Sequence, residues 1–80
     1  MHYIYFLQSL KDKGLYIGRT NNLERRLDEH NTGTVSSTKS RRPFKLLGYE
    51  IARSENESVV MEREWKKGYK REELKRHFGL

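Results

Sequence analysis

The chain has 80 residues, of which 34% are hydrophobic and 35% charged, so it has room for a single domain over residues 1–80 with one modest core. It has no cysteine, which excludes disulfides, thiolate zinc sites and cysteine nucleophiles, and no apolar run approaches the ~18 residues that span a bilayer. No membrane partner is expected, and a reducing cytosol is the expected compartment. Seventeen Lys and Arg against eleven Asp and Glu give a net charge of +6, which favours nucleic acid as the partner.

Two short segments rich in β-branched and aromatic residues, 2–7 and 15–18, predict a β-hairpin. Side chains alternate between the two faces of a strand, so Tyr5 lies on the face opposite to Ile4. If Ile4 and Ile17 share a face across the hairpin, Tyr5 and Tyr16 lie together on the other one. The register of the two strands decides this.

A helix is predicted next, over residues 22–30. Asn21 and Glu24 resemble a capping box, and Gly33 stops the segment. Residues four apart lie one above the other on a helix, so Arg26 and His30 are expected to project together. The loop 32–42 that follows is rich in hydroxyl groups, increasingly basic and free of acids. We expect it to face phosphates.

The second half of the chain predicts a third strand and two helices. Residues 44–52 follow Pro43 as the strand, and Ser54 with Glu57 gives a cap signature that opens a helix through residue 67. Gly68 is expected to end that helix. A strongly charged helix over residues 70–77 then closes on Gly79.

Some of these side chains are suited to phosphodiester chemistry. An arginine such as Arg26 binds phosphate oxygens, a carboxylate such as Glu62 or Glu64 holds Mg²⁺, and a tyrosine or histidine activates water. Strand tyrosines are more often core residues with a satisfied hydroxyl, and a helical arginine is usually solvated. Taken alone, these residues indicate a small basic α+β domain that contacts nucleic acid.

The order of the pieces resembles the GIY-YIG endonuclease family over almost the whole chain. The matching segments are Tyr3-Ile4-Tyr5, Tyr16-Ile17-Gly18-Arg19-Thr20, Asn22-Leu23, Arg26, His30, Ser37-Thr38-Lys39, Arg42-Pro43-Phe44-Lys45-Leu46 and the stretch 62–74. The resemblance implies an α+β fold in which helices flank a three-stranded, mainly antiparallel sheet. It also implies an endonuclease dependent on Mg²⁺ or Mn²⁺ that hydrolyses phosphodiester bonds, with DNA expected before RNA and repair or recombination as its setting.

The resemblance also assigns roles to single residues. Tyr5, Tyr16, Arg26 and His30 match the catalytic positions, although the first motif begins with Tyr3 where the family has glycine. Arg19 lies where the family commonly has lysine or another polar residue. Together with the basic loop, this gives the expected substrate contacts: Arg19, Lys39, Arg41 and Arg42.

The metal ligand has two candidates on one helix. Aligning the chain on Gly68 and Arg71 selects Glu62, whereas matching an Arg-Glu pair selects Glu64. We prefer Glu62, because two landmarks outweigh one.

The mechanism that the resemblance implies needs an activated tyrosine, because a free phenol with a pKa near 10 is rarely an anion at pH 7. Neighbouring cations such as Arg19, Arg26 and the metal favour the phenolate. Tyr16 or Tyr5 then activates the water, Arg26 stabilises charge on the phosphate, and Glu62 holds Mg²⁺ at the leaving oxygen. Whether His30 is the base or a relay stays open.

Two other classes of function compete with a nuclease. One is a nucleic-acid-binding module that keeps the scaffold without cleaving, and the other is a protein-interaction domain that uses the charged C-terminal helix. Eighty residues leave no separate DNA-binding domain. Target choice is therefore expected to come from substrate shape, a protein partner or a homodimer.

Overall fold

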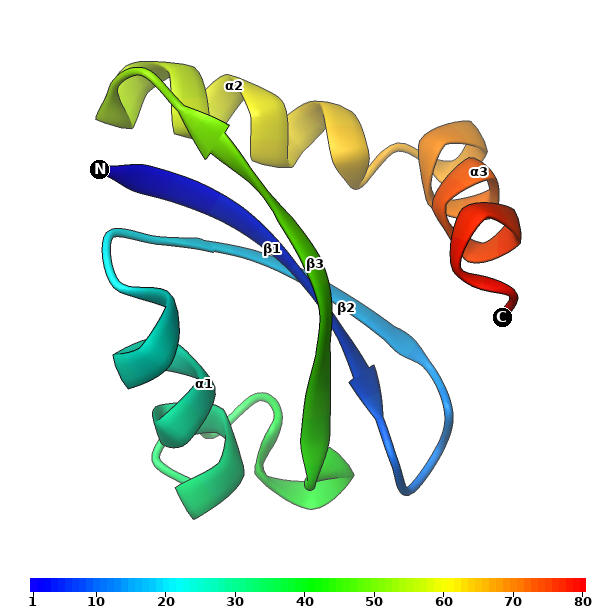
Figure 1. The fold of residues 1–80 in the computed structure, drawn as a ribbon. Helices are drawn as coiled ribbons and strands as arrows, with labels where there is room; N and C mark the ends of the chain where they lie inside the picture. Colours follow the sequence, from blue (N-terminus) through cyan, green and yellow to red (C-terminus); the bar gives the residue numbers. More distant parts are fainter.

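The central strand of the molecule is β1, which pairs on both of its edges. The computed structural model describes residues 1–80 and contains a three-stranded antiparallel sheet with the strand order β2-β1-β3 (Figure 1). This confirms the predicted α+β fold with helices flanking a three-stranded sheet. The elements are β1 (His2–Ser9), β2 (Leu15–Thr20), α1 (Leu23–Thr32), a 3-10 turn η1 (Lys39–Arg41), β3 (Phe44–Ala52), α2 (Glu55–Trp65) and α3 (Gly68–Phe78).

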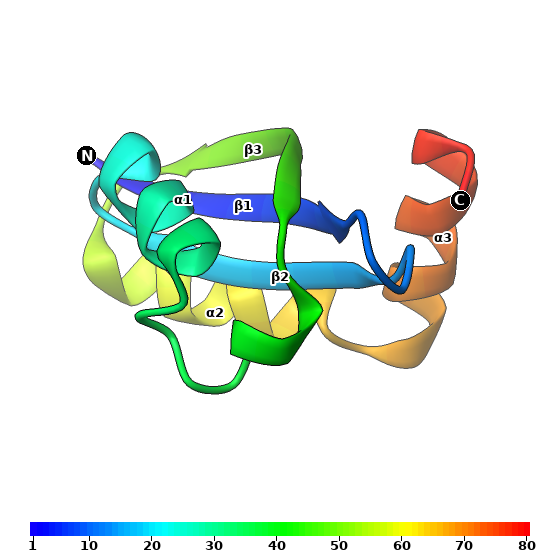
Figure 2. The same ribbon diagram turned by 90° about the horizontal axis from the view of Figure 1, so that it is seen from below.

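The sheet is covered differently on its two faces (Figure 2). Helix α1 packs on one face, where Tyr5, Leu7 and Phe44 form a small core. Helices α2 and α3 cover the other face, whose buried residues are Ile4, Phe6, Leu15, Ile17 and Leu74. The alternation predicted for the first strand is therefore confirmed, and each face of β1 serves a separate core.

The register of the hairpin brings the two motif tyrosines together. β1 pairs with β2 so that Phe6 lies opposite Ile17 and Tyr5 opposite Gly18. Tyr5 and Tyr16 then lie on the same face, with ring centroids 6.3 Å apart. The Tyr5 ring passes directly over Gly18, where a Cβ atom would overlap its Cζ and hydroxyl oxygen. Only glycine leaves room for this crossing.

The third strand has the predicted bounds, whereas the helix ends differ from the predictions: α1 runs on to Thr32, α2 ends at Trp65, and α3 begins at Gly68 and ends at Phe78. The N-cap of α1 is Asn22 and not Asn21, because the Asn22 side chain accepts from the backbone N–H of Arg25 at 3.1 Å. Gly68 does not end α2; it is the first residue of α3. The cap at Ser54 is confirmed by its bond from the Glu57 N–H at 3.1 Å. None of the three helices has the length and apolar character that crossing a membrane requires.

We expect Gly18→Ala to destabilise the protein by about 1–3 kcal/mol, because the added methyl group must displace the Tyr5 ring. Gly68→Ala is the matched control, since a Cβ at position 68 meets nothing within 4 Å. That variant should be neutral or slightly stabilising. Urea denaturation of both variants measures the difference, and equal stabilities would contradict the close contact over Gly18.

Candidate active site

A chain of buried hydrogen bonds joins β1, α1 and the following loop. The hydroxyl of Tyr5 lies 2.8 Å from Nε2 of His30, and Nδ1 of His30 lies 2.8 Å from Oγ1 of Thr38. All three residues are at most 2% exposed. Thr38 donates its own proton to the carbonyl of Val35 at 3.4 Å, so it accepts from Nδ1–H. Nε2 of His30 is then left to accept the proton of the Tyr5 hydroxyl.

The burial of this chain keeps both of its titratable groups neutral. Burial raises the pKa of Tyr5 to about 12, an effect that the hydrogen bond from Arg26 only partly offsets. Burial, helped by the positive charge of Arg26, lowers the pKa of His30 to about 4. At neutral pH, Tyr5 is therefore a phenol and His30 an uncharged imidazole with a free electron pair on Nε2.

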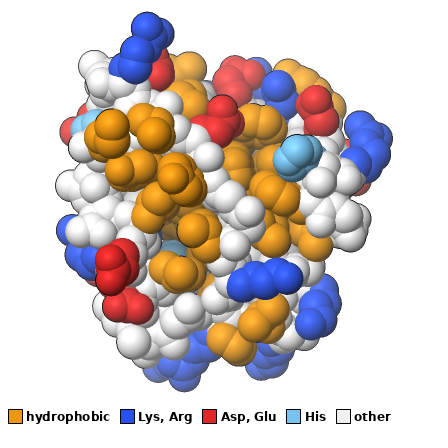
Figure 3. All heavy atoms as spheres, viewed as in Figure 1, with side chains coloured by type: hydrophobic (Ala, Val, Ile, Leu, Met, Phe, Trp, Pro, Cys, Tyr) orange, Lys and Arg blue, Asp and Glu red, His pale blue; other side chains and the backbone are white.

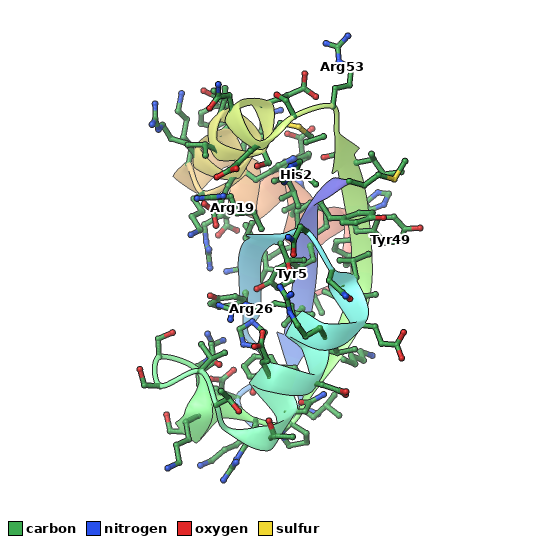
Figure 4. The ribbon with its side chains drawn as sticks, turned by 90° about the vertical axis from the view of Figure 1, so that its left-hand side faces the viewer. His2, Tyr5, Arg19, Arg26, Tyr49 and Arg53 are labelled. Atoms are coloured by element: carbon green, nitrogen blue, oxygen red, sulfur yellow. The ribbon has the colours of Figure 1, made fainter.

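Arg26 approaches the same hydroxyl from the side of the solvent. Its Nε lies 3.4 Å from the Tyr5 hydroxyl oxygen, and its Nη1 lies 3.3 Å from a carboxylate oxygen of Glu29. Figure 4 shows the Arg26 side chain beside Tyr5, with Arg19 farther off toward α2. The prediction that Arg26 and His30 project together from α1 is confirmed, because both reach the Tyr5 hydroxyl. One third of the Arg26 side chain remains exposed, so its guanidinium is accessible to a ligand.

Tyr16 completes the polar end of this face. Its half-buried ring packs against His30, with centroids 4.9 Å apart, and against Phe44 at 6.3 Å. No group of the protein hydrogen-bonds its hydroxyl, in contrast to that of Tyr5. The Tyr16 hydroxyl is thus left for water or a ligand.

The two candidate metal ligands point in different directions from α2. Oε1 of Glu62 lies 3.4 Å from Nε of Arg19, and its Oε2 lies 3.3 Å from Nζ of Lys66. The negative charge of Glu62 is among the influences that raise the pKa of Tyr5, which places it within electrostatic reach of the tyrosine. Glu64 instead contacts Lys67 at 3.0 Å, and its side chain is 46% exposed against 22% for Glu62.

Glu62 can serve a hard cation only as a single ligand. No group of three or more His, Asp or Glu side chains is arranged to hold a metal ion. A lone carboxylate still fits Mg²⁺, which keeps several waters and takes substrate phosphate oxygens as ligands. Such a site would be weak without nucleic acid.

The basic residues predicted to contact substrate are not all in one place. Lys39 and Arg42 line a polar hollow of about 490 Å³ together with Lys11, Ser36 and Ser40. Arg41 turns away from it and binds Asp12, with Nε 2.7 Å from a carboxylate oxygen. Arg19 faces Glu62. The structure therefore brings Lys39 and Arg42 together and separates Arg41 and Arg19 from them.

Sequence reasoning gave no role to two residues that fix this region. Thr38 holds the His30 ring, and Asn31 pins the start of β3 to α1 by bonding both the N–H and the carbonyl of Phe44, at 2.6 and 3.1 Å. Thr38 is one of several hydroxyl residues in its loop, and nothing local distinguishes the buried one. Asn31 lies one residue after His30, and a polar side chain at that position is expected to face solvent.

Comparison with known proteins agrees with this geometry. Residues 1–76 match the family model of the GIY-YIG catalytic domain. The chain belongs to the GIY-YIG family. It is thus a member of a nuclease family, and the family implies a nucleic-acid substrate.

Its relatives include small proteins of similar length. A UPF0213 protein of Syntrophus aciditrophicus is 43% identical over 75 residues, which cover 91% of this chain and 85% of that protein. A UPF0213 protein of Staphylococcus haemolyticus is 39% identical over 92% of this chain and 90% of its own length. The solution NMR structure of a UPF0213 protein from Bacillus halodurans superposes with a TM-score of 0.55 at 34% identity, covering 91% of this chain and 80% of that one. The name UPF0213 specifies no activity.

The depressed pKa of His30 predicts a stability that depends on pH. The unfolded chain protonates this histidine near 6.5, whereas the folded protein does so only near 4. The unfolded state therefore binds more protons between these values. The contribution of His30 to the free energy of unfolding is complete above pH 6.5 and is lost as the pH drops toward 4.

Urea denaturation between pH 7 and pH 4 measures this fall. The slope should flatten in His30→Gln and persist in the control His77→Gln, whose histidine is exposed. The carboxyl of Asp12 does not interfere, because Arg41 lowers its pKa from 3.8 to about 2 and its contribution is lost only at lower pH. An unchanged slope in His30→Gln would contradict the buried neutral imidazole.

Proposed function

We propose that this protein is a metal-dependent endonuclease that hydrolyses phosphodiester bonds, with DNA as its substrate. The observation that carries the proposal is the meeting of Tyr5, Tyr16, Arg26 and His30 on one face of the sheet. Their contacts leave the half-exposed positions, Tyr16 and Arg26, available for a ligand. A phosphate group bound there would meet a permanent cation and a free hydroxyl.

Exposure favours Tyr16 over Tyr5 as the group that activates water. Tyr5 is 2% exposed, and its hydroxyl is already bonded to His30 and Arg26. Tyr16 is half-buried, and its hydroxyl has no partner in the protein. In the proposed reaction Tyr16 acts as a phenolate, having released its own proton to solvent. It accepts a proton from water, the resulting hydroxide attacks phosphorus, the bond to the leaving oxygen breaks, and that oxygen takes a proton from solvent.

Tyr5, His30 and Thr38 support this reaction by holding Arg26 in place. The Tyr5 hydroxyl gives its proton to Nε2 of His30, so its oxygen accepts from Nε of Arg26. Arg26 can then direct its remaining N–H groups to the phosphate, where negative charge builds up in the transition state. The guanidinium is fixed before substrate arrives, which reduces the cost of reorganising the site.

Glu62 is the residue that would hold Mg²⁺ or Mn²⁺. When bound, the ion would supply positive charge to the scissile phosphate and the leaving oxygen. Arg19 and Lys66 contact the Glu62 carboxylate, which orients it. Lys39 and Arg42, with Lys11 beside them, are proposed to bind phosphates farther along the strand.

A cleavage assay on duplex, single-stranded, flapped and branched DNA and on RNA, with and without Mg²⁺, tests the function. Cleavage of DNA that needs the divalent ion supports the proposal. Binding without cleavage of any substrate would assign the chain to the non-catalytic class of nucleic-acid-binding modules.

We expect Arg26→Ala to lower the cleavage rate by about 10²-fold or more, because the transition-state donor is lost. The matched control is Arg25→Ala, since Arg25 is the neighbouring helix residue, 55% exposed and directed to Asn21 and Glu29. It should cleave within a few-fold of the parent. Single-turnover rates measure the difference, and a fully active Arg26→Ala would remove this arginine from the site.

The two α2 glutamates should respond in opposite ways to the same substitution. Glu62→Gln keeps the shape but removes the charge that a hard cation requires, so cleavage should fall sharply while nucleic-acid binding is kept. Glu64→Gln should remain active, because Glu64 faces solvent and Lys67. Rates measured over a Mg²⁺ titration decide between them. If only Glu64→Gln is inactive, Glu64 is the metal ligand and not Glu62. If both variants are active, the proposal of a single-carboxylate metal site is wrong.

A further inference from the structure

Another hollow of the protein lies on the face of the sheet opposite to Tyr5 and Tyr16. It is a groove of about 560 Å³ between β3 and α3. Figure 3 shows apolar side chains on either side of β3, and the area nearer α3 is edged by acidic groups and a histidine. The groove is lined by Phe6, Leu47, Gly48, Tyr49, Glu50, Trp65, Glu73, Leu74, His77 and Phe78.

The charge of this groove is opposite to that of the whole molecule. Its lining holds two carboxylates, Glu50 and Glu73, and neither lysine nor arginine, in a chain of net charge +6. The polar hollow lined by Lys39 and Arg42 has the reverse composition, with three cations and no acid. A phosphate backbone would be repelled from the groove, which argues against a role in binding nucleic acid.

Glu50 leaves one hydrogen-bonding atom unsatisfied there. It pairs with Ile4 across the sheet, so its side chain is on the face of α2 and α3. Its Oε1 is the only buried side-chain oxygen or nitrogen of the protein without a hydrogen-bond partner. A buried polar atom without a partner destabilises a fold, so an occupant that donates to it would gain both a charge and a hydrogen bond.

The edge of the sheet beside the groove is also free. β3 pairs only with β1, so the backbone groups on its other edge have no strand to bond. Tyr49 and Ile51, 51% and 52% exposed, pair with Tyr5 and Tyr3, so their side chains lie on the opposite face of this strand from the groove. An open edge of this kind accepts an extended segment as an added strand.

We infer that the groove binds an extended segment of a partner protein that carries arginine or lysine next to apolar residues. The segment lies along the free edge of β3, its apolar side chains contact Trp65 and Phe78, and its cation bonds Oε1 of Glu50. The ring of Trp65 is not the cation site, because Nζ of Lys70 already lies 5.0 Å from its centroid. Such a partner would help to choose the target of the nuclease.

The test uses two peptides that differ only in charge. Acetyl-Val-Arg-Phe-Val-amide carries the guanidinium, and its counterpart has citrulline in place of arginine, a neutral group of the same shape. Trp65 is the only tryptophan of the chain and lines the groove, so its fluorescence reports occupancy. Amide chemical shifts in labelled protein identify the face that is contacted.

We expect the arginine peptide to bind about tenfold or more tightly than the citrulline peptide, with shifts at β3 and α3. Glu50→Gln should abolish the preference while leaving the stability of the protein unchanged or higher, because an unpaired carboxylate is removed. Glu72→Gln is the control, since it lies next to Glu73 on α3 but outside the groove and should keep the preference. Nuclease rates are independent of this comparison.

Several results would overturn the inference. These are equal affinity for both peptides, no binding of either one, or shifts confined to the α1 face. Sedimentation that finds a dimer whose interface blocks the arginine peptide would make the groove a contact between two copies. Shifts at Glu50 and Trp65 on adding duplex DNA would instead assign it to nucleic acid.

Discussion

The structure depends on the burial of one hydroxyl group, that of Tyr5. A phenol oxygen in the middle of a sheet must be hydrogen-bonded, and it lies too far inside for water to satisfy it. His30 supplies the acceptor, which fixes the position of α1, and Thr38 orients His30, which fixes the loop after α1. Gly18 makes the arrangement possible, because the ring can reach α1 only by crossing a residue without a side chain.

Part of the site could be predicted from the sequence, because it depends on local periodicities of strands and helices. Alternation along a strand placed Tyr5 on the face opposite to Ile4, with the hairpin register still to decide whether Tyr16 joins it, and four-residue spacing on a helix placed Arg26 above His30. Both are local periodicities that the backbone enforces wherever the element forms. The strand Phe44–Ala52 was equally predictable, because an apolar segment between Pro43 and the Ser54 cap has clear limits.

The remaining features depend on contacts between residues far apart in the chain. Asn21 and Asn22 are both good caps by residue type, and in the structure the second one caps α1. Gly68 could end one helix or begin the next, and the short turn after Trp65 decided for the latter. Arg41 looked like a free phosphate ligand until the fold brought Asp12, 29 residues away, within 2.7 Å of it. Long-range pairing of this kind has no periodicity that a sequence displays.

A sheet of three strands has only two faces, and the acids of the groove lie on the face opposite to Tyr5 and Tyr16. Acids gathered near Tyr16 and Arg26 would repel a phosphate, whereas on the far side of the sheet Glu50 and Glu73 do not disturb the site. Two acids do lie near the site: Glu29 contacts Arg26 directly, and Glu62 contacts Arg19 of β2. Arg19 and Lys66 both contact it, so one negative and two positive charges leave that cluster with a net charge of +1. The carboxylate can therefore stand beside a polyanion without opposing its approach, while its oxygens remain suited to a hard cation.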